Sequence, residues 1–122
     1  MNYLAIDYGT KRIGLAIAIN DIISPILPIK NDSDKYHNIK NIIKDHRVDK
    51  IFVGICEGEF ADKTKQFVDK LKSVIELDVE LIEEAVSTIE ADTIYKENKK
   101  SKKKYKSLID SIAAAVILRR AI

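Results

Sequence analysis

Three acidic residues lie far apart in the sequence, each at a point where a carboxylate could do chemistry. Asp7 closes one apolar stretch, Glu84 directly follows another, and Asp110 lies near the start of a third. A carboxylate beside apolar residues is costly unless hydrogen bonds, a cation or a metal compensate it. Carboxylates without Cys or His nearby suit hard cations such as Mg²⁺ or Mn²⁺, and two such ions can drive phosphodiester hydrolysis. Asp7, Glu84 and Asp110 are therefore the candidate catalytic residues and the candidate metal ligands.

The segment that follows Asp7 adds polar groups, in the order Asp7-Tyr8-Gly9-Thr10-Lys11-Arg12-Ile13-Gly14. The two glycines permit turn angles or a close approach of the backbone. A hydroxyl and two cations, on Thr10, Lys11 and Arg12, follow the acid closely, as a phosphate-binding site requires. An ordinary hairpin turn, in which Asp7 accepts hydrogen bonds from the turn amides, explains the same residues. Both interpretations stay open on this segment alone.

The other two acids also have simpler explanations. Glu84, next to Glu83, could be a solvated loop acid that favours the N-terminus of the following helix. Asp110 stands three residues after Ser107 and could be a capping acid in the first turn of the closing helix. A common site for all three acids is the sharper hypothesis.

The charge is distributed unevenly along the chain. The 21 Lys and Arg residues against 19 Asp and Glu give a net charge of +2. The strip from Lys96 to Lys106 nevertheless holds seven lysines and a single acid, so the rest of the chain is acidic. We expect this basic strip to contact the backbone phosphates of a nucleic acid, with Lys102, Lys103 and Lys104 among the contacts. The alternative is a solvated lysine loop.

Periodicity predicts how the chain is built. Alternating apolar residues predict strands over 3–7, 12–19 and 22–29, joined by turns at Tyr8–Lys11 and Asn20–Asp21. Pro25 and Pro28 mark the third strand as an edge strand. This opening third is an antiparallel three-stranded meander.

Helices and strands then alternate. We predict a helix capped by Asp34, a strand over 50–54, a helix over 61–75, a strand over 79–82, a helix from Ser87 to about Tyr95, a basic loop and a closing helix over 107–118. This order predicts one α/β domain, residues 1–122, with a mixed five-stranded sheet. Ligands collect at the carboxyl ends of parallel strands, so adjacent strands would bring Asp7 and Glu84 together.

Composition excludes several classes of protein. No apolar run approaches the roughly 20 residues that span a bilayer, so we expect no membrane partner. The single cysteine, Cys56, cannot form an internal disulfide, which fits a cytoplasmic protein. His37 and His46 lack the spacing of metal ligands. The sequence leaves the oligomeric state open.

Three motifs resemble the YqgF/RuvX family, in the correct order and over nearly the whole chain. They are Asp7-x-Gly9-Thr10-x-x-x-Gly14, the strand ending at Glu84 followed by Ser87-Thr88-x-Glu90-Ala91, and Asp110-x-x-Ala113-Ala114-x-x-Ile117-Leu118. Members of the family are described as candidate Holliday-junction resolvases and candidate pre-16S rRNA nucleases. The resemblance implies an RNase H-like fold, a divalent-metal-dependent nuclease and a role in maturing small-subunit ribosomal RNA. It places the family's acids on Asp7, Glu84 and Asp110.

The chain also departs from the family pattern. Ala85 stands where the family commonly has an arginine, and Gly54-Ile55-Cys56 lacks the usual proline. Glu57, Gly58 and Glu59 replace an expected Gly-Thr. These changes affect the expected substrate contacts more than metal binding.

Three functions therefore compete. The first is a metal-dependent nuclease acting on structured RNA, such as a ribosomal RNA precursor, or on branched DNA. The second is a non-catalytic RNA-binding factor in ribosome assembly. The third is an ATP-binding domain, because the first motif also resembles the phosphate loop of the actin, sugar-kinase and Hsp70 ATPases. Those proteins close two such domains around the nucleotide, and this chain has room for one.

Overall fold

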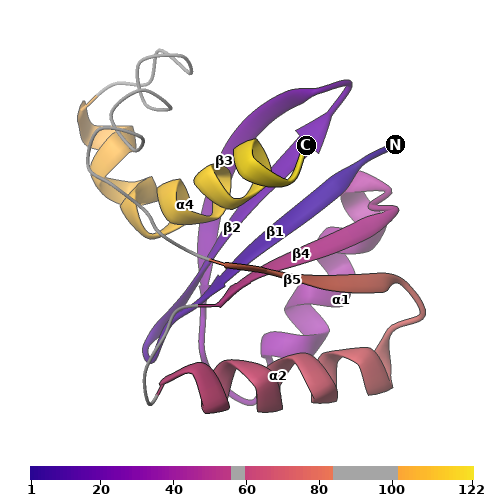
Figure 1. The fold of residues 1–122 in the computed structure, drawn as a ribbon. Helices are drawn as coiled ribbons and strands as arrows, with labels where there is room; N and C mark the ends of the chain where they lie inside the picture. Colours follow the sequence, from indigo (N-terminus) through magenta and orange to yellow (C-terminus); the bar gives the residue numbers. More distant parts are fainter. Residues whose placement is uncertain (56–59, 84–101) are drawn as a thin grey trace.

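A mixed five-stranded sheet forms the centre of the chain (Figure 1). The computed structural model describes residues 1–55, 60–83 and 102–122, with side chains described from Ser111 onward in the last segment. The strand order is β3-β2-β1-β4-β5. Neighbours pair antiparallel from β3 to β1 and parallel from β1 to β5. The strands are β1 (Tyr3–Tyr8), β2 (Arg12–Ile19), β3 (Ile22–Lys30), β4 (Lys50–Ile55) and β5 (Asp78–Glu83).

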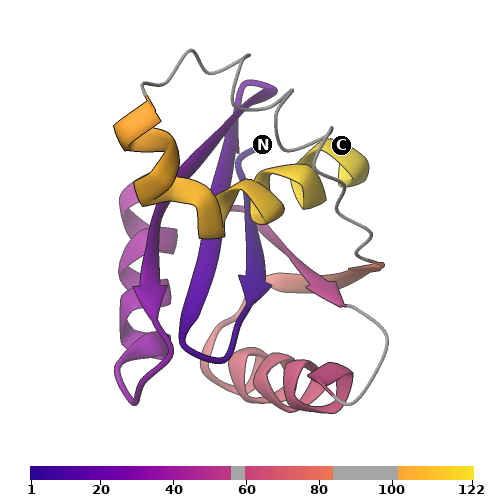
Figure 2. The ribbon, with the colours of Figure 1, turned by 90° about the vertical axis from the view of Figure 1, so that its left-hand side faces the viewer.

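Helices cover both faces of this sheet. Figures 1 and 2 show α1 (Lys35–His46) and α2 (Phe60–Val74) on one face and α4 (Lys102–Ala121) lying across the other. Residues that alternate along each strand divide between two apolar clusters. Leu4 and Ile6 of β1 pack toward α1 and α2, whereas Ala5 packs toward α4. No described helix is both long and apolar enough to cross a membrane.

The predicted meander is confirmed, and β3 is an edge strand as its prolines indicate. Asn20 and Asp21, at the turn between β2 and β3, have φ of 53° and 65°. Positive φ at both central residues is the signature of a type I′ hairpin turn. The β2–β3 register shifts between Ile13 and Leu15, so that Leu27 and Pro28 stand opposite Gly14 in a bulge.

Small residues line the interface between α4 and the sheet. Ala5, Ala16 and Ala18 of the strands meet Ala114 and Ala115 of the helix, and all five are buried. Short side chains let the helix backbone approach the strands closely. Ser111 Oγ accepts a hydrogen bond of 3.1 Å from the backbone N–H of Leu15, next to the bulge. This buried bond joins residues 96 positions apart and fixes α4 on β2.

Two boundaries differ from the sequence-based predictions. The closing helix begins at Lys102 rather than Ser107, so the expected loop over 102–106 is wrong. Lysine is a good helix former, and a run of charges has no apolar period to reveal a helix. Asp110 therefore lies about two turns inside α4 rather than in its first turn, and the capping explanation does not apply.

The start of α1 also differs in detail. Asp34 occupies the N-cap position, but its side chain makes no capping hydrogen bond. Instead, Asp32 Oδ1 accepts a 2.9 Å hydrogen bond from the Asp34 N–H. The helix expected over 87–95 lies outside the described residues.

Replacing Ser111 with Ala should destabilise the fold by about 1–3 kcal/mol, because it leaves the buried Leu15 N–H without a partner. Urea unfolding measures the change. Ser73→Ala is the matched control, since Ser73 is an exposed helical serine that bonds only its own helix, at Lys70 O. Both variants gain the same helix propensity, so equal stabilities would show that the Ser111 bond contributes nothing.

Candidate active site

Asp7 lies near the carboxyl end of β1, between two glycines. Its partner on the antiparallel side is Gly14, and its partner on the parallel side is Gly54. Asp7 shares the α4 face of the sheet with Ala5, two positions before it. Side chains directly opposite each other on neighbouring strands stand about 4.5–5.5 Å apart. Neither glycine has a side chain, so no strand neighbour directly opposite Asp7 packs a side chain against this partly buried carboxylate.

The strand that leads to Glu84 ends at the same edge of the sheet. Glu83, the last residue of β5, pairs with Ile55 of β4, and Gly54 pairs with Ile82. The expectation that β1 and β5 are adjacent is wrong, because β4 lies between them. Two strand spacings separate β1 from β5 by about 10 Å. Glu84 lies one residue beyond β5, outside the described residues, so its place in the site stays a prediction.

Helix α4, which carries Asp110, lies across the face of the sheet that also carries Asp7. Ser111, the next residue, binds the N–H of Leu15, which adjoins Gly14. Gly14 in turn is the partner of Asp7 in the β1–β2 ladder. The hydrogen bond of Ser111 thus holds the α4 backbone close to the strand position opposite Asp7. The side chain of Asp110 lies outside the described residues, so its role as a ligand also stays a prediction.

The loop after β1 is held by a residue that the sequence analysis missed. Asn31, just after β3, donates from Nδ2 to the carbonyl of Gly9 at 2.8 Å. Its backbone N–H donates to the carbonyl of Lys11 at 3.0 Å. Gly9 itself is required, because a Cβ there would overlap the carbonyl oxygen of Arg12. The loop is therefore fixed by backbone contacts, while the side chains of Thr10, Lys11 and Arg12 are exposed.

Aromatic rings anchor the end of β1 on the opposite face. The Tyr8 ring stacks on Phe67 at 4.3 Å and on Phe60 at 5.7 Å between ring centroids, both in α2. Tyr36 of α1 stacks on Phe67 from another side. Burial raises the pKa of Tyr36 above its ordinary value, and the neighbouring Tyr8 raises it further. Asp7 thus stands on a strand end that is packed firmly on its other face.

The described residues show no contact to the candidate site from the predicted lysines or from His37. Lys102, Lys103 and Lys104 form the first turn of α4, and their side chains lie outside the described residues. His37 Nε2 lies 3.3 Å from Asn41 Nδ2 on the surface of α1. Among the side chains that the structure describes, no three His, Cys, Asp or Glu residues cluster as metal ligands. Glu84 and the side chain of Asp110 are not among the described residues.

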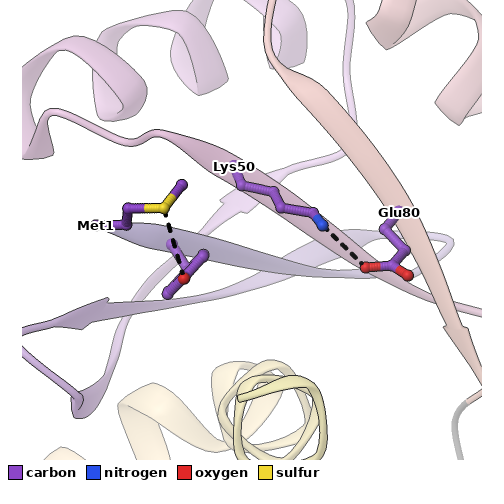
Figure 3. Close-up of polar contacts among 4 residues, drawn as sticks. Met1, Lys50 and Glu80 are labelled. Carbon is purple, nitrogen blue, oxygen red and sulfur yellow. Dashed lines mark hydrogen bonds and ion pairs between the residues drawn. The ribbon is translucent and has the colours of Figure 1, made fainter.

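A hollow of about 430 Å³ lies at the opposite, amino end of the parallel strands. Lys50 Nζ lies 3.2 Å from Glu80 Oε2, between β4 and β5, and this ion pair is drawn in Figure 3. Both charged side chains are partly exposed, so this ion pair contributes at most about 1 kcal/mol. The hollow is separate from the edge that carries Asp7.

Replacing Asn31 with Ala should destabilise the protein by about 0.5–1.5 kcal/mol, because the carbonyl of Gly9 loses a donor. Denaturant unfolding measures this. Asn41→Ala, which removes only a surface contact with His37, is the control and should change the stability by less. An Asn31→Ala variant as stable as the wild type would show that the Asn31 side chain does not hold the loop after β1.

Comparisons with known proteins show which family this chain resembles. The family model described as Holliday junction resolvase, RuvX, matches residues 1–122. A protein of Halothermothrix orenii named "Putative pre-16S rRNA nuclease" is 32% identical, over 97% of this chain and 91% of its own. A Sulfurihydrogenibium protein with the same name is 36% identical, over 94% of this chain and 85% of its own.

Among solved structures, the Fowlpox virus resolvase bound to Holliday junction DNA resembles this chain with a TM-score of 0.61 and 16% identity. That likeness covers 98% of this chain and 96% of the viral chain, and it shows the fold alone. The same viral resolvase in another crystal structure gives a TM-score of 0.60. The sheet order, the helix layers and these matches make the fold RNase H-like, as the sequence predicted. The chain belongs to the RuvX family.

Proposed function

We propose that this chain is a divalent-metal-dependent nuclease that processes the precursor of the 16S ribosomal RNA. The observation that carries the proposal is the position of Asp7, on a rigid strand end and between Gly14 and Gly54. An acid near the carboxyl end of a strand, with a glycine opposite it on each neighbouring strand, stands where a ligand can approach it. Relatives at 32% and 36% identity with nuclease names support the same activity.

The donors fit Mg²⁺ or Mn²⁺. Asp7, Glu84 and Asp110 offer carboxylate oxygens, which hard divalent ions prefer. Glu84 follows the end of β5, two strands from β1, and Asp110 precedes Ser111, which binds the N–H of Leu15 beside the ladder partner of Asp7. These positions support a common site for the three acids. Such ions, when bound, activate water and stabilise the leaving oxygen of a phosphodiester. The protein's part is to hold the three carboxylates and to bind the flanking phosphates.

RNA is the favoured substrate over branched DNA. The relatives that share about a third of their residues with this chain carry the ribosomal RNA name. The viral resolvase that binds a Holliday junction shares only 16% identity. A hydrolysis assay with a ribosomal RNA precursor and a four-way DNA junction in parallel separates the two substrates.

A non-catalytic RNA-binding role is the second candidate, and Ala85 favours it. That alanine removes an arginine that the family commonly places after the middle acid. Binding of precursor RNA without cleavage, under both Mg²⁺ and Mn²⁺, would select this role over the nuclease.

Replacing Asp7 with Asn should lower the rate of RNA hydrolysis at least about 100-fold. A catalytic metal contributes several kcal/mol to the transition state, and each 1.4 kcal/mol is about tenfold in rate. The measurement is cleavage of labelled precursor RNA in Mg²⁺ or Mn²⁺, with EDTA abolishing it in the wild type. Glu84→Gln and Asp110→Asn should lose as much, and double variants should lose little more, since the acids act as one unit.

Asp45→Asn is the control for this experiment. Asp45 is an exposed carboxylate in the last turn of α1, on the other face of the sheet. Its variant should cleave at the wild-type rate. Circular dichroism and thermal unfolding must show that Asp7→Asn is folded. A folded Asp7→Asn protein with wild-type activity would overturn the assignment.

A further inference from the structure

Two cationic residues, Arg12 and Lys30, lie near the carboxyl end of β1 that carries Asp7, and Lys30 has no role assigned so far. Arg12 begins β2, Lys30 ends β3, and the two are direct partners in the antiparallel ladder. Direct partners place their side chains on the same face, roughly 5 Å apart. Both side chains are exposed. Two exposed cations in this position offer hydrogen-bond donors to the same anion.

Arg12 and Lys30 lie on the same face as Asp7. Along β2, Ala16 and Ala18 pack toward α4, and Gly14 and Arg12 continue that alternation toward the strand's start. Gly14 is the partner of Asp7, so Arg12 is its diagonal neighbour, about 7–8 Å away. Lys30 lies one strand farther, and two strand spacings put β3 about 10 Å from β1. Asp7, Arg12 and Lys30 therefore lie in a row that runs from β1 across β2 to the edge strand β3.

The backbone around Lys30 is held in place. The N–H of Asn31 donates to the carbonyl of Lys11 at 3.0 Å, which ties the end of β3 to the start of β2. The Asn31 side chain ties the same point to Gly9. The nearest following acid, Asp32, accepts the N–H of Asp34 and so belongs to the turn before α1. These bonds keep Lys30 opposite Arg12.

We propose that Lys30 and Arg12 together bind a backbone phosphate of the substrate, one that flanks the scissile phosphate at Asp7. An anion between two like charges turns their repulsion into attraction, and lysine and arginine are the usual phosphate ligands in nucleic-acid interfaces. A contact about 10 Å from the acid fixes the strand's register on the site without taking part in bond cleavage. This inference rests on the proposed nuclease function, and it adds Lys30 to the substrate surface.

The test is the salt dependence of binding to a fluorescein-labelled single-stranded RNA, in EDTA so that no hydrolysis intervenes. Each neutralised phosphate contributes about 0.7 to the slope of log K against log salt. Lys30→Gln should therefore reduce the slope by about 0.7 and weaken binding about fivefold at 0.1 M salt. Lys30→Arg should restore both values. Lys72→Gln removes an exposed lysine from the last turn of α2, on the far face, and should change neither.

Thermal unfolding separates a binding role from a structural one. Lys30 is exposed at the end of β3, so the melting temperature of Lys30→Gln should match that of the wild type. A lower melting temperature, or a slope equal to that of Lys72→Gln, would overturn the proposal for Lys30 while leaving the nuclease function standing. If the wild type does not bind RNA at all, the proposed function itself fails.

Discussion

One buried hydrogen bond, from the N–H of Leu15 to Ser111 Oγ, determines how the last helix meets the sheet. The bond is possible because a bulge in the β2–β3 pairing disturbs the ladder beside Gly14 and because alanines on both surfaces bring α4 close. It fixes the rotation of α4 about its axis as well as its distance from β2. A helix that merely rested on the sheet through apolar contacts could slide or turn, since such contacts have no direction. The proposed place of Asp110, the residue before Ser111 in α4, depends on this hydrogen bond.

The end of β1 has two faces with different tasks. Tyr8 points toward α2, where its ring stacks on Phe67, and this packing makes the strand end rigid. Asp7 lies on the other face, and its two ladder partners, Gly14 and Gly54, have no side chains. Alternation along a single strand thus puts an anchoring ring and the candidate metal-binding carboxylate on consecutive residues. A site on such a strand holds its geometry better than one on a loop, which matters because small displacements of a catalytic group are costly.

The sequence predicts those parts of the fold that leave a periodic pattern. The meander, the edge character of β3 and the turn at Asn20 and Asp21 all follow from alternation, prolines and turn residues. The start of α4 at Lys102 does not, because lysines carry no apolar period. The place of β4 between β1 and β5 is also hidden, since chain order does not fix strand order. Asn31 was missed because its partners are backbone carbonyls about 20 residues earlier, and no residue type signals such a contact.

The proposed function brings two groups of like charge to the carboxyl end of β1. Asp7, Glu84 and Asp110 are the proposed metal ligands, and Lys30 is the direct partner of Arg12 in the β2–β3 ladder. On the proposed function, a divalent cation is the counterion of the acids and a backbone phosphate is the counterion of the bases. A metal and a nucleic-acid backbone bring both counterions to the site together. The net charge of +2 then averages two opposed local charges, each suited to a different part of the reacting complex.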